Sequence, residues 1–178
     1  MAALAPDKVA FIDPRHQVSH AELQRQVDRC ALGLLELGVR PGDVVSFQLP
    51  NWIEWIVVPN AATRIGAISN PLIPIYRERE LGFSGPGSVN GARGAQRVPG
   101  FDYPGMIETL RPDWPDQQHV LVVDGKPGQG TSSWEVFKAT LWEARRNPDH
   151  WGSSNRSSFA RCSPGAGGGR QQGARRTP

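Results

Sequence analysis

Residues 41–83 constrain the fold of this 178-residue chain more than any other part of the sequence. They begin with a Pro-Gly-Asp turn, after which Val44–Leu49 has the length and the β-branched, aromatic composition of one buried strand. Apolar residues at three-and-four spacing from Trp52 predict a helix, which Gly66 ends, and a second short strand starts at Ala67. Strand, helix and strand in so short a stretch form a βαβ unit with parallel strands, so we predict an α/β fold.

Two details of this unit give sharper expectations. Asn51 precedes the predicted helix, so we expect its side chain to cap the first turn. Pro59 lies two turns into the same helix, where it lacks a backbone donor and clashes with the preceding turn. We therefore predict either a kink at Pro59 or a helix broken near Val58.

The first forty residues read as a hairpin followed by an amphipathic helix. Val9–Asp13 is predicted as a strand that turns back into Val18. Ser19 with Glu22 three residues later predicts a capping box, and Gly38 ends the helix. The predicted apolar face of this helix consists of Leu23, Val27, Cys30, Ala31, Leu34, Leu35 and Leu37.

Five pieces of the sequence, in this order, resemble the N-terminal region of AMP-forming acyl-CoA synthetases, which are acyl-adenylate-forming ligases. The pieces are Pro6–Phe11, Ser19–Leu23, Leu37–Trp55, Arg64–Phe83 and Gly100–Pro104, with the likeness running on to about Asp149. The resemblance implies a partial parallel sheet with flanking helices, as the N-terminal part of the large adenylate-forming domain.

The same resemblance implies an acid–CoA ligase that activates a carboxylic or fatty acid with ATP and Mg²⁺ and then transfers the acyl group to CoA. That chemistry requires a Gly/Ser/Thr-rich phosphate loop ending in Pro-Lys-Gly, a Thr-Glu pair, a ribose-binding Asp and a C-terminal lysine. The sequence contains none of these motifs. We therefore assign no catalytic, cofactor-binding or metal-ligating residue, and we expect the chain alone to be inactive and to bind no cofactor.

The residues that imitate functional motifs have simpler interpretations. Gly125–Ser133 contains Gly, Lys, Ser and Thr, but in the wrong order for a phosphate loop, and is predicted to be a surface loop. Arg77–Glu80 is predicted to be a solvated helix start, and Trp52 and Trp55 are predicted to pack in the core. The histidines have no partner at metal-ligand spacing; they are His16, His20, His119 and His150.

Charge and composition point away from nucleic acid and membranes. Residues 1–150 carry 15 Lys and Arg against 17 Asp and Glu, whereas residues 151–178 carry five Arg and no acidic residue, so only the tail is basic. Cys30 is predicted to be buried, and Cys162 is the only other cysteine, so no disulfide framework is expected. With no signal peptide and no apolar run long enough to span a bilayer, we expect a cytoplasmic protein.

The second half of the chain is less regular. A short helix is predicted at Met106–Leu110, a buried strand at His119–Val123 and a helix at Trp134–Arg146. Ser84–Pro99 has four glycines, no acidic residue and no hydrophobic period. We thus divide the chain into a ligase-like region, 1–150, interrupted at 84–99, and a basic tail, 151–178, which is predicted to be disordered.

Both irregular segments are rich in Gly, Ala, Arg, Ser and Pro, whose codons are rich in G and C. We interpret Ser84–Pro99 and the tail as out-of-frame translation, with a natural insertion and a linker as the alternative. A sheet lacking one strand between Ala67 and His119 would follow, because nothing in Ser84–Pro99 replaces an apolar strand. The second functional hypothesis is a non-catalytic module that binds another protein, or itself, through an exposed apolar face.

Overall fold

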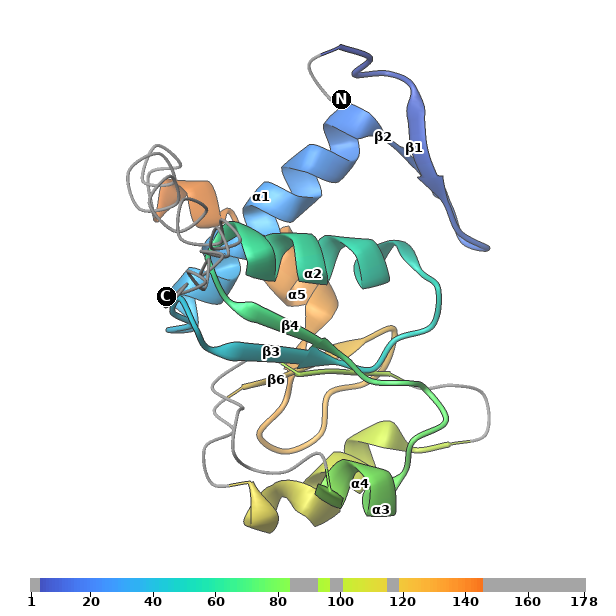
Figure 1. The fold of residues 1–178 in the computed structure, drawn as a ribbon, viewed down its shortest axis with the longest axis vertical. Helices are drawn as coiled ribbons and strands as arrows, with labels where there is room; N and C mark the ends of the chain where they lie inside the picture. The colour runs from blue at the N-terminus through green and yellow to red at the C-terminus, as the bar shows by residue number, and fades with distance from the viewer. Residues whose placement is uncertain (1–3, 84–92, 97–100, 115–118, 146–178) are drawn as a thin grey trace, which may run out of the picture.

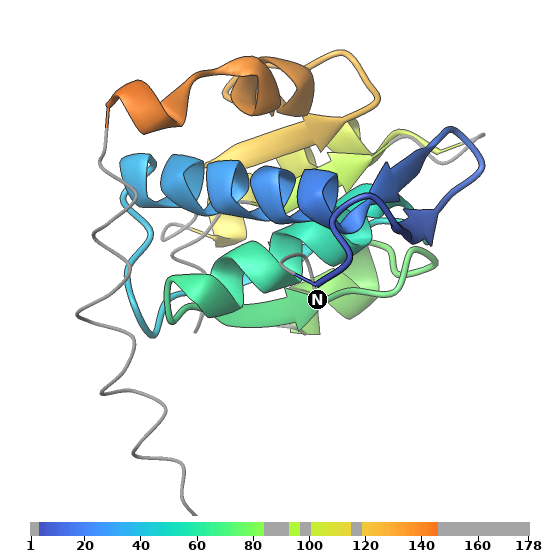
Figure 2. The same ribbon diagram turned by 90° about the horizontal axis from the view of Figure 1, so that it is seen from above.

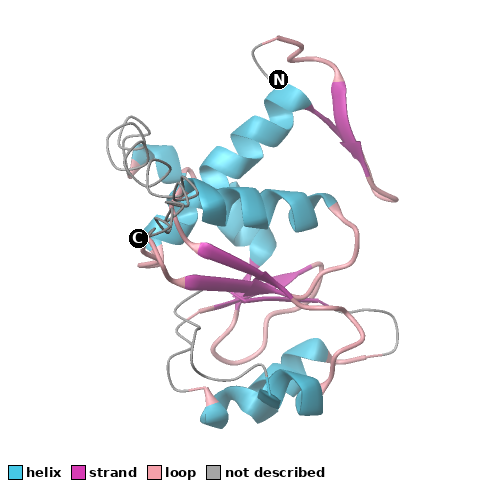
Figure 3. Cartoon of the chain, viewed as in Figure 1, coloured by secondary structure: helices cyan, strands magenta, loops and turns pink. Residues whose placement is uncertain are grey.

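The structure is a computed structural model, which describes residues 4–83, 93–96, 101–114 and 119–145. In chain order the elements are β1 (Val9–Ile12), β2 (Gln17–Ser19), α1 (His20–Glu36), β3 (Val44–Phe47), α2 (Ile53–Arg64), β4 (Ile68–Pro71), α3 (Glu78–Phe83), β5 (Arg93–Gln96), α4 (Tyr103–Leu110), η2 (Arg111–Asp113), β6 (Val120–Val123), β7 (Ser132–Ser133), α5 (Trp134–Ala139) and η3 (Trp142–Ala144). A five-stranded sheet, in the order β4-β3-β5-β6-β7, lies between two helical layers (Figures 1 and 3).

All neighbouring strands of the five-stranded sheet are parallel. Helices α1, α2 and α5 cover one face, and α3 and α4 cover the other (Figure 1). Seen from above, α1 lies between α2 and α5 (Figure 2). The fold is therefore α/β, with a small parallel sheet and flanking helices, as the sequence predicts.

The N-terminal hairpin and α1 follow the local sequence signals. β1 and β2 pair antiparallel, and the Ser19 hydroxyl accepts a hydrogen bond from the Glu22 N–H at 3.2 Å, which confirms the N-cap. At the other end Gly38 has φ +88°, and the Val39 N–H donates to the Leu34 carbonyl at 3.0 Å. This is a Schellman ending, in which only glycine adopts the left-handed conformation without strain.

The predicted βαβ unit is confirmed. β3 is buried along its length and pairs with β4 in parallel register, from Val44 opposite Ile68 to Phe47 opposite Pro71. Gly66, with φ +76°, ends α2 just before β4 begins. The connecting helix lies on the face of the sheet that also carries α1 (Figure 1).

Of the two outcomes predicted for Pro59, the break near Val58 is wrong, because α2 runs from Ile53 to Arg64 with Pro59 inside it, whereas a kink stays a prediction. Val58 and Ala62 are buried on either side of the proline, so packing holds the chain helical despite the missing donor. One residue beyond, the Asn60 side-chain amide donates to the Ile56 carbonyl at 2.7 Å.

The prediction that the sheet lacks a strand between Ala67 and His119 is also wrong. β5, Arg93–Gln96, pairs along all four residues with β6, from Arg93 opposite Val120, and reaches β3 through Gly94 opposite Phe47. The reason is that β3 and β6 each have backbone groups that need a partner, and any extended segment can supply one. Strand pairing has overridden the weak β-propensity of the sequence.

The elements from Gly125 to Arg145 differ in length from those that the sequence predicts. The sequence predicts one helix over Trp134–Arg146, but α5 ends at Ala139 and a short 3₁₀ turn, η3, follows. The loop predicted at Gly125–Ser133 ends in β7, a two-residue strand parallel to β6. Ser133 then caps α5 by accepting from the Glu135 N–H at 3.1 Å.

Two apolar clusters fill the two faces of the sheet. The larger joins α1, α2 and α5 to β3, and contains Ala31, Leu34, Val45, Val57 and Phe137 among its buried members. The smaller lies under α3 and α4, and is formed by Leu72, Leu81, Tyr103, Met106, Ile107, Leu110, Trp114 and Val120. The predicted tail at 151–178 and most of Ser84–Pro99 lie outside the described residues.

Candidate functional site

The order of the strands indicates a candidate binding site at the carboxyl end of β3. β3 has β4 on one side and β5 on the other, so the chain reverses its direction of winding there. In open parallel sheets, ligands bind in the crevice beyond the carboxyl ends of the strands at such a reversal. The first turn of α2 follows directly after β3 and would present its free N–H groups to a bound anion.

In this chain a carboxylate of the protein itself occupies that position. The Ile53 N–H, at the start of α2, donates to Asp13 Oδ2 at 3.0 Å, although the two residues are 40 positions apart. The predicted cap by Asn51 is wrong: the N-cap is Trp52, which makes no side-chain cap bond. Asp13 thus neutralises the helix end from the β1–β2 turn.

Asp13 is held in place by several donors. Its Oδ1 accepts from the Arg15 and His16 N–H groups, both at 2.8 Å, and Arg15 Nη2 lies 3.0 Å from its Oδ2. Burial alone would raise the pKa of Asp13, but these hydrogen bonds and the one from Ile53 outweigh it and hold the pKa well below its ordinary value. The carboxylate is therefore ionised at neutral pH.

Arg15 links this carboxylate to the helix surface. Its guanidinium also pairs with the buried carboxylate of Glu54, and its Cζ lies 3.8 Å from the centre of the Trp52 ring. A cation over an indole face adds a favourable electrostatic contact. The prediction that Trp52 packs against the core is confirmed. The same prediction for Trp55 is wrong, because Trp55 is 39% exposed.

The loop after β4 is held near the same end of β3 by hydrogen bonds from other parts of the protein. Gln48, which is buried at the end of β3, donates from Nε2 to the Ile73 carbonyl at 2.9 Å and to the Tyr76 carbonyl at 3.0 Å. The Tyr103 hydroxyl donates to the Pro74 carbonyl in the same loop. These bonds fix the loop after β4 across the end of the sheet.

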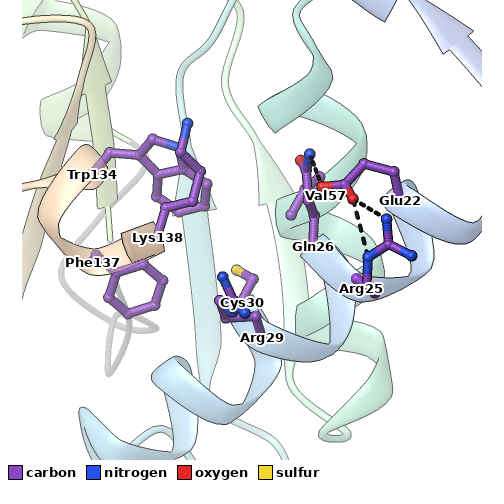
Figure 4. A pocket seen from close by; sticks show the side chains of 9 residues that line it. All are labelled: Glu22, Arg25, Gln26, Arg29, Cys30, Val57, Trp134, Phe137 and Lys138. Carbon is purple, nitrogen blue, oxygen red and sulfur yellow. Dashed lines mark hydrogen bonds and ion pairs between the residues drawn. The ribbon is translucent and has the colours of Figure 1, made fainter. Parts of the chain in front are cut away.

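A groove of about 270 Å³ lies between α1 and α5, on the side of the sheet that these helices cover with α2 (Figure 4). Its floor is apolar and consists of Cys30, Val57, Trp134 and Phe137. The rim carries Arg25, Arg29 and Lys138, and each pairs with a carboxylate of its own. The groove therefore offers no free cation for an anionic ligand.

Two groups in the groove floor have unusual surroundings. Trp134 Nε1 is buried and has no hydrogen-bond partner, which is a destabilising arrangement for an N–H donor. Burial raises the pKa of the Cys30 thiol to about 12, so the thiol stays protonated and unreactive at neutral pH. The prediction that Cys30 is buried is confirmed.

Among the described residues, neither the Gly125–Ser133 loop nor the histidines form a catalytic or metal-binding site. Arg111 Nη2 donates to the Gly130 carbonyl at 2.9 Å, which ties the Gly125–Ser133 loop to η2. His16 Nδ1 lies 3.5 Å from Asp13 Oδ1. Within the described ranges no group of three or more His, Cys, Asp or Glu side chains could hold a metal ion. The described helices also include none with the length and apolarity needed to cross a membrane.

Comparison with known proteins identifies the family. Residues 1–84 match the family described as AMP-binding enzyme. The salicyl-AMP ligase/salicyl-S-ArCP synthetase of Mycobacterium tuberculosis is 41% identical over 129 residues, which cover 69% of this chain and 23% of that protein. The medium-chain fatty-acid–CoA ligase of Escherichia coli is 40% identical over 82 residues, covering 45% of this chain and 14% of that protein.

Solved structures agree with this assignment. The apo structure of Mycobacterium smegmatis MbtA superimposes with a TM-score of 0.68 at 34% identity, covering 79% of this chain and 25% of that one. Acetoacetyl-CoA synthetase from Streptomyces lividans gives 0.66 at 29% identity, covering 78% and 24%. The chain belongs to the adenylate-forming ligases and corresponds to their N-terminal region. It spans about a quarter of the length of these relatives.

Proposed function

We propose that this chain is the N-terminal part of an acid-activating ligase and that it does not catalyse adenylation by itself. In the complete reaction a carboxylate attacks the α-phosphate of ATP, which gives an acyl-adenylate and pyrophosphate, and the thiol of CoA then displaces AMP. We propose that the complete enzyme uses Mg²⁺ to bind the phosphates of ATP. We also propose that it acts in the cytoplasm, since ATP and CoA are available there.

The main support for the proposal is that the carboxylate of Asp13 already binds the N-terminal end of α2. A phosphate bound at that helix would need the N–H group of Ile53, which Asp13 already holds at 3.0 Å. The 178 residues of the sequence include no Gly/Ser/Thr-rich loop ending in Pro-Lys-Gly that could bind phosphate elsewhere. The named relatives act on an aryl acid and on a fatty acid, so the proposal stays at the level of a carboxylic acid.

Exchange of labelled pyrophosphate into ATP tests the proposal. The purified chain should give background exchange with a panel of aryl, short-chain and medium-chain acids. The intact Mycobacterium tuberculosis relative, assayed in parallel with salicylate, serves as the positive control. Acid-dependent exchange by the homogeneous chain would overturn the proposal.

A second candidate function is a non-catalytic module that binds another protein. Three exposed isoleucines favour it: Ile68 on the edge strand β4, and Ile73 and Ile75 in the loop that follows β4. A chain that acts as such a module should be soluble and monodisperse when purified, whereas an incomplete domain should aggregate. Size-exclusion chromatography with light scattering separates the two.

We also propose that Ser84–Pro99 and residues 151–178 are translated out of frame. The structural corollary, a missing strand, is wrong, but the composition of both segments still supports a shifted reading frame. Translation of the gene in its two other frames decides the question. The interpretation fails if neither frame gives an apolar strand at 84–99 or a phosphate loop downstream of residue 150.

A further inference from the structure

The groove between α1 and α5 ends at a close contact between the two helices. A Cβ atom at Gly33 would clash with the Phe137 ring, so it is the missing side chain of Gly33 that lets this ring pack directly onto α1. The groove residues of α1 run from Glu22 to Cys30 and all precede Gly33. The groove therefore lies beyond this contact, along the N-terminal half of α1 (Figure 4).

Aromatic packing fixes the floor of the groove. The rings of Trp134 and Phe137 stack with their centres 5.4 Å apart, and the ring centres of Phe137 and Trp142 are 5.3 Å apart. Trp142 Nε1 donates to the Phe137 carbonyl at 2.8 Å, which ties these rings to the backbone of α5. A preformed floor of this kind loses little conformational entropy when another flat ring packs on it.

The two indole N–H groups of this aromatic cluster differ. That of Trp142 is bonded to the protein, whereas Trp134 Nε1 has no hydrogen-bond partner, although Trp134 is only 3% exposed. A buried donor without an acceptor destabilises the fold, and an acceptor that reaches it recovers this free energy as binding. Because Trp134 lines the groove, a molecule in the groove is able to carry that acceptor.

Lys138 is placed to cover the indole N–H of Trp134. The indole nitrogen is out of contact with solvent, so an acceptor reaches it only when a neighbouring side chain moves. Lys138 also lines the groove and lies four residues after Trp134 on α5, so its stem is directed back toward that residue. Its amine pairs with Glu135 at 2.9 Å, in an exposed ion pair of a kind that contributes little to stability. Lys138 is therefore free to turn away at small cost.

The charges on the rim disfavour a charged ligand. Arg25 Nε lies 3.1 Å from a carboxylate oxygen of Glu22, and Arg29 Nε lies 3.0 Å from one of Glu143. An anion would have to displace one of these carboxylates, and a cation would face the basic side chains of the rim. The ligand that fits these surroundings is uncharged.

The volume of the groove limits the size of this ligand. An apolar cavity of about 150 Å³ holds one benzene molecule. The groove, at about 270 Å³, has room for one aromatic ring with a short substituent. We propose that the groove binds a small uncharged aromatic compound, whose ring packs on Trp134 and Phe137 and whose carbonyl oxygen accepts from Trp134 Nε1. This site is separate from the end of β3, so it stands apart from the proposed function.

Titration of the isotope-labelled 178-residue chain with acetophenone, followed by NMR, tests the proposal. Acetophenone is uncharged and carries one aromatic ring and one carbonyl. It should shift the indole N–H signal of Trp134 saturably, with a Kd of about 1 mM, as expected for so small a ligand. The indole N–H signal of Trp142, which is already bonded to the protein, is the internal control and should move far less. The two signals are assigned by their loss in Trp134→Phe and Trp142→Phe.

Three variants, followed through the Val57 methyl signals, separate the parts of the proposal. Trp134→Phe keeps an aromatic ring but removes the donor, and should weaken acetophenone binding about fivefold. Lys138→Ala removes the covering stem and should bind at least as tightly as the wild type. Val136→Ala is the matched control on α5, since Val136 is 68% exposed and is not among the groove residues, and it should leave binding unchanged.

Two results in the wild-type chain would overturn the proposal whether or not the variants fold. One is a Trp134 indole signal that acetophenone leaves unshifted, as when water alone serves this N–H. The other is equal binding of benzoate, which has the same ring but is charged at neutral pH, because the rim would then not select an uncharged ligand. Among the folded variants, full affinity in Trp134→Phe or weaker binding in Lys138→Ala would also overturn it.

Discussion

The two βαβ units of the sheet, β3–α2–β4 and β5–α4–β6, have the same architecture but differ in how their sequences specify it. β3 is an apolar strand that is buried along its length, and glycine and proline mark its limits. β5 reads Arg-Gly-Ala-Gln, without an apolar pattern, yet it occupies the central position of the sheet between β3 and β6. The difference shows that neighbouring strands can determine the place of a strand whose own sequence does not.

The most disruptive test of this difference is a proline in β5. Ala95 lies opposite Val122 within the central strand, so Ala95→Pro removes backbone pairing where it cannot be replaced. We expect a loss of about 3 kcal/mol or more in the free energy of unfolding, measured by urea denaturation. Ser69→Pro on the free edge of β4 is the control and should cost less. Equal effects would show that β5 is not a central strand.

In the unit β3–α2–β4, the contact that we expect to matter most for stability is the cap of α2 by Asp13. Asp13→Ala removes the acceptor for the Ile53, Arg15 and His16 N–H groups and one partner of the Arg15 guanidinium. We expect a loss of about 3 kcal/mol in the free energy of unfolding. Asn51→Ala should leave stability nearly unchanged, since Asn51 does not cap the helix. A large effect of Asn51→Ala would contradict the assignment of the cap to Asp13.

The ionised carboxylate of Asp13 should make a contribution to the free energy of unfolding that is lost at low pH. The pKa of Asp13 is below its ordinary value of 3.8 in the folded chain, so its contribution is fully present above that value and is lost as the pH falls toward the folded pKa. The stability difference between wild type and Asp13→Asn should be constant from about pH 5 to 7 and shrink below about pH 4. A difference that persists unchanged down to about pH 2 would show that Asp13 does not titrate in this way.

The smallest expected effect concerns Pro59, which α2 tolerates inside a continuous helix. Pro59→Ala restores a donor for the Trp55 carbonyl and removes a steric clash. We expect the variant to be about 1 kcal/mol more stable in urea denaturation, less than the full difference in helix propensity, because packing around Pro59 has adapted to the ring. A destabilised variant would mean that the ring itself fills the core.

The elements that the sequence predicts correctly are those with local signals. Ser19 and Gly38 sit next to the helix ends that they cap, so a short window of sequence contains both partners. The cap of α2 by Asp13 joins residues 40 positions apart, and no local pattern connects them. Gln48 likewise bonds to carbonyls 25 and 28 positions away. These contacts exist only once the sheet has formed.

Amide hydrogen exchange of the folded chain, resolved to single residues by NMR, tests the central claim most directly. The claim is that Arg93–Gln96 is a hydrogen-bonded central strand, as its pairing with Val120–Val123 requires. The β5 amides that face β3 or β6 should therefore exchange as slowly as those of β6, and far more slowly than the Ser69 amide, which faces the free edge of β4. Fast exchange throughout Arg93–Gln96, with β6 still protected, would contradict the claim.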